Sequence, residues 1–82
     1  MSARVIPFPA NRRRDLIHSI ARRVFELSPE AGEKHIRRSL DGQATVLRRK
    51  GVEEPLIARD AAGLEAAVRA AIWLAVVRHE EG

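Results

Sequence analysis

Two breaks divide the sequence into three segments of helical length, and they constrain the fold more than any other feature. At Ser28-Pro29 a capping side chain precedes proline, which is favoured in the first turn of a helix. At Gly51 and Pro55 a glycine suited to ending one helix is followed by a proline that can begin the next. The chain of 82 residues is long enough for one small domain. We therefore expect an all-α fold with three helices, at residues 12–27, 29–50 and 55–79.

Each segment carries apolar residues at intervals of three and four, the spacing of a helix with one buried face. In the first segment, which Asn11 is suited to cap, they are Leu16, Ile17, Ile20, Val24 and Leu27. In the second they are Ala31, Ile36, Leu40, Ala44 and Leu47, and in the third Ile57, Ala61, Leu64, Val68, Ala71 and Ala75. Because the connections are short, neighbouring helices should be antiparallel, and residues 12–82 should form one compact three-helix bundle. Gly42 predicts a kink in the second helix or the close approach of another helix.

Residues 1–11 are expected to form an extended N-terminal arm. Within it, Val5-Ile6-Pro7-Phe8-Pro9 cannot be helical, because proline excludes the helical conformation for the residue before it. The apolar side chains of this arm would either pack as a flap across the helices or serve as a short docking motif.

Charge is distributed unevenly along the chain. Residues 1–50 hold 12 Lys/Arg and 5 Asp/Glu, a net charge of +7, whereas residues 51–82 hold 3 Arg and 6 Asp/Glu, a net charge of −3. A basic half is typical of a protein with an anionic partner, although arginines can also simply solvate a small domain. Acidic and basic residues at i, i+4 spacing predict three intrahelical ion pairs: Glu30/Lys34, Glu33/Arg37 and Glu65/Arg69.

Catalytic chemistry finds little support in the sequence. There is no cysteine, and the three histidines, His18, His35 and His79, lie in different segments without a ligand at metal-binding spacing. No nucleophile elbow, glycine-rich phosphate loop or paired-carboxylate motif is present. We expect no catalytic, metal-binding or cofactor-binding residues. The longest apolar run, residues 70–77, is too short to span a membrane, so we expect a soluble, cytoplasmic protein.

The last part of the third segment, residues 70–77, is apolar on all sides. Trp73 lies off the main apolar stripe, among small residues that would leave a shallow groove for another helix. Tryptophan and arginine are the residues that most often anchor protein interfaces. The expected partner-binding residues are Trp73, Val77, Arg69, Arg78, Arg12, Arg13, Arg22 and Arg23. The alternative is that Trp73 is a central core residue packed against Phe25 and Phe8.

Three groups of residues resemble, in their order and spacing, a family of very short α-proteobacterial proteins. They are Val5-Ile6-Pro7-Phe8-Pro9 with Arg12-Arg13-Arg14, Ser28-Pro29-Glu30-Ala31 with Glu33-Lys34-His35, and Leu64-Glu65-Ala66-Ala67-Val68-Arg69-Ala70 with Trp73. Most members have no assigned function. The chain resembles in particular the QseM-type antiactivators of rhizobial integrative and conjugative elements. This resemblance implies a protein that binds and disables transcription activators, namely a LuxR-type (TraR-like) quorum-sensing regulator and an FseA-like activator, and so represses conjugative transfer. It supplies no binding-site residues.

Two other functions remain open. The arginine doublets and the basic first half also suit a small DNA-binding or nucleoid-associated protein, although adjacent arginines on a helix point about 100° apart and so do not form one sharp recognition stripe. In the other alternative, the chain forms a dimer in which the segment of residues 70–77 pairs with itself.

Overall fold

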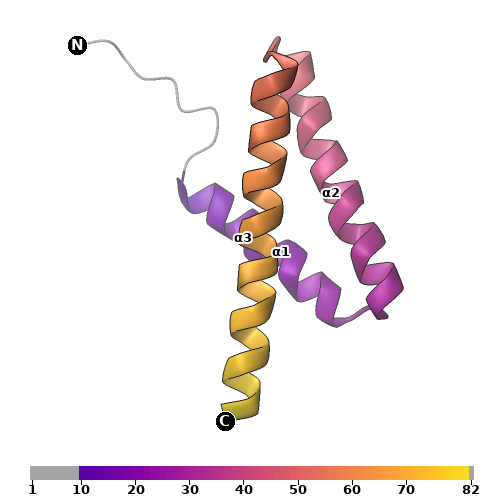
Figure 1. Ribbon diagram of the computed structural model, residues 1–82, viewed down its shortest axis with the longest axis vertical. Coiled ribbons are helices and arrows are strands. Elements are labelled where there is room, and N and C mark those ends of the chain that lie inside the picture. Colours follow the sequence, from indigo (N-terminus) through magenta and orange to yellow (C-terminus); the bar gives the residue numbers. More distant parts are fainter. Residues whose placement is uncertain (1–9, 82) are drawn as a thin grey trace, which may run out of the picture.

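The computed structural model describes residues 10–81, and the side chains of residues 13–80. It contains three helices: α1 (Ala10–Phe25), α2 (Pro29–Arg49) and α3 (Glu54–Glu81). Every pair of helices is in contact, so the predicted all-α three-helix bundle is confirmed. Figure 1 shows α2 running antiparallel beside one half of α3, while α1 crosses α3 near its middle. The predicted extended arm, apart from its last two positions, lies outside the described residues.

One buried cluster joins the three helices. Ile20 of α1, Ile36 of α2 and both Leu64 and Val68 of α3 form its centre, and the two α3 side chains are 0% exposed. Five partly buried side chains pack around this centre: Leu16, Ile17, Val24, Leu40 and Ile72. The periodic apolar stripes of all three segments therefore meet in one core, as amphipathic helices require.

The ends of α2 follow the local signals at Ser28 and Gly51. The Ser28 hydroxyl accepts a hydrogen bond from the backbone N–H of Ala31 at 3.2 Å, which confirms the predicted cap. At the other end, Gly51 has a φ of +84°, a conformation in which glycine carries no steric penalty. The backbone N–H of Gly51 donates to the carbonyl of Arg48, and the N–H of Val52 donates to the carbonyl of Leu47, both at 3.1 Å. This is the Schellman arrangement.

The start of α1 differs from the prediction. The helix begins at Ala10, so Asn11 lies within its first turn and is not its cap. A helix boundary is the least certain feature of a sequence pattern, because fraying and capping geometry decide it.

Helix α1 approaches α2 closely at Gly32. The sequence had suggested such an approach at Gly42 instead. A Cβ placed on Gly32 would lie 3.1 Å from Cγ1 of Val24, whereas a Cβ on Gly42 would meet nothing within 4 Å. Gly42 is exposed on α2. The expected close approach at Gly42 is therefore wrong, whereas the alternative expectation, a kink at Gly42, stays a prediction.

The bundle is less compact than expected. Its radius of gyration is 14.4 Å, whereas a compact domain of this length has about 12 Å. The reason is α3, whose 28 residues span about 42 Å and exceed both neighbours in length. Its C-terminal part extends past the other helices (Figure 1), and Ala75, expected in the core, is exposed.

Candidate functional site

A groove lies between the N-terminal half of α1 and the C-terminal half of α3. It encloses about 640 Å³. From α1 it is lined by Arg13, Arg14, Ile17 and His18, and from α3 by Ala67, Ala70, Ala71, Leu74, Ala75 and Arg78. Most of this lining is apolar, and every charged residue in it is an arginine.

Helix periodicity explains why these residues share one groove. On α1, residues 13 and 17 lie one turn apart, as do residues 14 and 18, so four side chains form two adjacent rows. On α3, alanines at 67, 71 and 75 form a row beside Leu74 and Arg78. Because alanine has little bulk, α3 presents a flat floor there, and α1 supplies a wall with basic groups along it.

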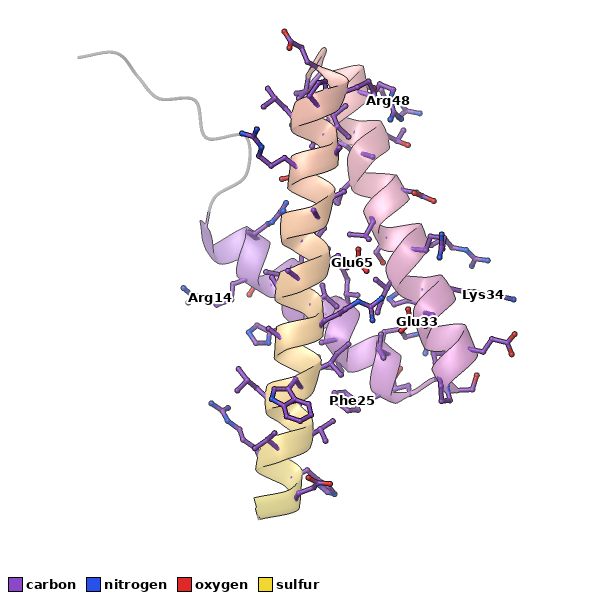
Figure 2. The ribbon with its side chains drawn as sticks, viewed as in Figure 1. Arg14, Phe25, Glu33, Lys34, Arg48 and Glu65 are labelled. Carbon is purple, nitrogen blue, oxygen red and sulfur yellow. The ribbon has the colours of Figure 1, made fainter. Side chains whose placement is uncertain are left out.

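Arg13 attaches α1 to α3 at one end of this groove. Its Nη2 atom lies 3.1 Å from Oδ1 of Asp60 and donates at 3.4 Å to the Asp60 backbone carbonyl. Arg13 is half-buried, so this residue, predicted to contact a partner, is used in part to hold two helices together. Within the described residues, neither Arg14 nor Arg78 forms an ion pair. Arg14 projects from α1 on the side of α3 away from α2 (Figure 2).

Arg69 lies on another face, where it connects α3 to α2. Its two terminal nitrogens donate to the two carboxylate oxygens of Glu33 at 3.0 and 2.8 Å. Its Nε donates to Glu65 at 3.0 Å, which confirms the predicted pair on α3. These hydrogen bonds from Arg69 hold the pKa of Glu33 below its ordinary value and raise the pKa of Arg69. Figure 2 shows Glu33 and Glu65 facing each other across the α2–α3 contact.

Trp73 is not a core residue, because 66% of its surface is exposed. It follows Leu64 by nine residues, a rotation of about 180° around the helix, so it points away from the core. Val77 lies on the same outer side of α3 and is partly buried. Phe25, the expected core neighbour of Trp73, is itself 52% exposed.

Arg22 and Arg23 do not line the groove. Arg23 binds Glu26 at 2.8 Å, one turn along near the end of α1. Arg22 lines a smaller depression with Phe25 and Ala75. The side chain of Arg12 lies outside the described residues. Of the eight predicted residues, the structure thus brings Arg13 and Arg78 together in the groove and places Trp73 and Val77 on an adjacent surface.

A family model matches the whole chain, residues 1–82, and carries the description of a family of unknown function, DUF6074. The chain belongs to DUF6074. Comparison with curated proteins and with solved structures gives no match. Membership of DUF6074 carries no activity, so the surfaces of the chain are the basis for proposing one.

Sequence reasoning missed Arg14, Ile17, His18 and Leu74 as members of the groove. Arg14 ends the Arg12-Arg13-Arg14 run, and Leu74 lies within the run that is apolar on all sides, so both signals were visible. The sequence does not show that α1 crosses α3 near the middle of α3, because the spacing of apolar residues does not fix the crossing angle between two helices.

Two kinds of feature are absent from the described part of the chain. Among residues 10–81, no group of histidine and acidic side chains is arranged to hold a metal ion. None of the three helices has a stretch long and apolar enough to cross a bilayer.

Proposed function

We propose that this DUF6074 protein is a non-enzymatic antiactivator that binds a helix of a transcription activator in the α1–α3 groove. The observation that carries the proposal is the composition of that groove: an apolar floor of alanines and Leu74, with only arginines as charged residues along its margin. A surface of this kind suits the docking of an amphipathic helix, whose apolar face enters while polar residues remain at the rim.

The length of the groove suits a docked helix of a few turns. Its α3 floor runs from Ala67 to Arg78, about 16 Å along the axis, which corresponds to about three turns of a docked helix. Because alanines form the floor, the backbone of a partner helix can approach closely. Leu74, of which 53% is exposed, is more exposed than Ile17, the other large apolar residue lining the groove, and is the expected anchor.

The charges at the margin specify the partner further. Arg14 and Arg78 flank the apolar floor, one on each helix. Acidic residues on either side of the partner's apolar stripe would complement them and raise the rate of association, with an effect that salt reduces. The proposed ligand is therefore an amphipathic helix with acidic margins.

The link to transcription activators rests on the resemblance to QseM-type antiactivators. In this proposal the partners are a TraR-like quorum-sensing regulator and an FseA-like activator, and binding represses the transfer of a conjugative element. The protein would act in the cytoplasm, where these activators bind DNA. Occupation of the activator's surface is sufficient for this effect, so the proposal requires no catalytic group.

Co-purification with a TraR-like or FseA-like activator tests this proposal. The Leu74→Glu variant places a charge on the groove floor and should weaken binding at least tenfold. Leu56→Glu makes the same change at an exposed leucine of α3 outside the groove and should bind normally. If neither activator is retained by the wild type, or if Leu74→Glu retains it equally well, the proposal is wrong.

DNA binding is the second candidate, and one depression favours it. This depression lies at the α1–α2 turn and is lined by Arg23, Leu27, Ala31, Lys34, His35 and Arg38, without an acidic residue. Lys34 points away from the bundle in Figure 2, accessible to a phosphate backbone. Binding through several phosphates should fall by orders of magnitude between about 50 and 200 mM salt, and Lys34→Glu with Arg38→Glu should abolish it. Weak salt dependence would exclude this candidate.

A further inference from the structure

Helix α3 carries two seams with the spacing of a coiled coil, on opposite sides. The inner seam consists of Ile57, Ala61, Leu64, Val68, Ala71 and Ala75, all of which are buried or partly buried except the exposed Ala75. The outer seam consists of Arg59, Gly63, Ala66, Ala70, Trp73, Val77 and Glu80. In both seams the residues recur at alternating intervals of four and three, the positions at which two helices pack along their length. The outer seam is displaced from the inner seam by two residues, which corresponds to a rotation of about 200° around the helix.

Neither α1 nor α2 covers the outer seam. Gly63, Ala66, Ala70 and Trp73 are all exposed, and Val77 is partly exposed. From Gly63 to Val77 the seam has no charged residue, and it is bounded by Arg59 at one end and Glu80 at the other. An uncharged strip about 21 Å long that contains an exposed tryptophan is typical of a surface that another helix covers.

We propose that the outer seam pairs with the outer seam of a second copy of the chain, with the two α3 helices antiparallel. The seam is small in its first half, where it has Gly63, Ala66 and Ala70, and large in its second half, where it has Trp73 and Val77. Antiparallel pairing places Ala70 opposite Trp73 of the second copy and Ala66 opposite its Val77. Each layer then combines a small residue with a large one, which close packing requires.

A parallel pair would not fit in this way. It would place the two tryptophans on each other and the two Ala70 side chains on each other, so that one layer would be overfilled and the next would contain a void. The same size pattern favours a second copy of the chain over an arbitrary helix. When the seam is turned end to end, its small residues lie opposite the large residues of the original seam.

The charges at the ends of the seam lead to the same orientation. Arg59 and Glu80 are both exposed and carry opposite charges. Antiparallel pairing brings Arg59 of one copy within about one turn of Glu80 of the other, whereas parallel pairing would bring like charges together.

This dimer is independent of the proposed antiactivator function. The outer seam and the α1–α3 groove share only Ala70. Arg14, Leu74 and Arg78 lie outside the seam, so the two surfaces can be changed separately. A failure of self-association would leave the groove unaffected, and a failure of activator binding would leave the dimer unaffected.

Sedimentation equilibrium of the full chain tests the self-association. We expect about twice the chain mass of 9.2 kDa, decreasing toward the monomer on dilution. Trp73→Glu should give a monomer with unchanged helical circular dichroism, and Leu56→Glu, a leucine-to-glutamate change at an exposed α3 position outside the seam, should remain dimeric. A wild type that is monomeric at millimolar concentration, or a dimer unaffected by Trp73→Glu, would overturn the proposal. The proposal would also be overturned if the wild type is a monomer and the Trp73→Glu variant no longer binds the activator, because the seam would then be a contact for the activator.

Disulfide trapping tests the orientation, because the chain has no cysteine of its own. The single variants Ala66→Cys and Val77→Cys are mixed and oxidised under mild conditions. Antiparallel pairing predicts a disulfide between position 66 of one copy and position 77 of the other, since the Cβ atoms of a disulfide lie about 3.5–4.5 Å apart. Homodisulfides at each position, without the mixed product, would show parallel pairing and contradict the proposed geometry.

Discussion

Arg69 of α3 binds both carboxylate oxygens of Glu33 of α2, at 3.0 and 2.8 Å, and binds Glu65 on its own helix as well. One guanidinium thus links α2 to α3 at the surface, beside the buried contact of Ile36 with Leu64. Its planar, forked shape suits this bidentate contact in a way that a lysine would not. Arg69 therefore contributes to the fold, in contrast to Arg14 and Arg78, which form no ion pair among the described residues.

This pairing predicts how Glu33 titrates. The hydrogen bonds from Arg69 hold the pKa of Glu33 below its ordinary value, and those from Arg48 do the same for Glu54. Since both folded-state pKa values are lowered, their contribution to stability is complete above the unfolded value of about 4.3 and is lost as pH falls through the folded values. Carboxyl chemical shifts measured by NMR should show both low pKa values.

The Arg69→Gln variant provides the control for this titration. It should return the pKa of Glu33 to the ordinary range and leave that of Glu54 low, because Glu54 binds Arg48 at 2.6 and 3.0 Å on a separate part of the surface. If the pKa of Glu33 is ordinary in the wild type, the α2–α3 ion pair does not form in solution.

The core predicts a large difference between two leucines of α3. Leu64 is fully buried, so Leu64→Ala should destabilise the fold by about 2–5 kcal/mol. Leu56 is half exposed, so Leu56→Ala should have a much smaller effect. Urea unfolding followed by circular dichroism measures both. Equal losses would show that the core is not centred on Leu64.

The two glycines within α2 should respond differently to alanine. Gly42→Ala fills open space in a helix interior and should stabilise the protein by up to about 1 kcal/mol. Gly32→Ala should gain less or lose stability, because its Cβ would press on Val24 at 3.1 Å. Thermal unfolding of the two variants, measured under the same conditions, compares their stabilities. A greater gain in stability for Gly32→Ala than for Gly42→Ala would contradict the close α1–α2 approach at Gly32.

Ser28 should contribute measurably through its cap. Removal of the hydroxyl in Ser28→Ala leaves the N–H of Ala31 without its side-chain acceptor and should cost about 1 kcal/mol. Ser39→Ala is a matched control, because the Ser39 hydroxyl donates to the His35 carbonyl, which already lies within the α2 ladder. Chemical unfolding should therefore show a loss for Ser28→Ala that exceeds the loss for Ser39→Ala.

Local signals predicted the helices well because each depends on a few adjacent residues. Ser28, Pro29 and Gly51 fixed the ends of α2, and the periodic apolar residues identified Ile20, Ile36, Leu64 and Val68 as core. Contacts between helices could not be predicted in this way. Glu33 was expected to pair with Arg37 one turn away, but it binds Arg69, 36 residues along the chain.

The candidate surfaces show the same limit. The apolar run at residues 70–77 indicated an interface, but its division into a groove side and an outer side depends on where α1 crosses α3. Trp73 illustrates this limit. A large apolar residue can belong either to the core or to an interface, and the direction of its side chain decides between them. Only the position of α3 relative to its neighbours shows that Trp73 points outward.

The most direct test of the central claim is affinity capture from nuclease-treated lysate of the host, with captured proteins identified by mass spectrometry. The wild type, Leu74→Glu and Leu56→Glu are compared under identical conditions. If the groove binds the activator, the wild type and Leu56→Glu will both retain a transcription activator, and Leu74→Glu will lose it. Partners that disappear with nuclease, or an activator retained equally by Leu74→Glu, would contradict it.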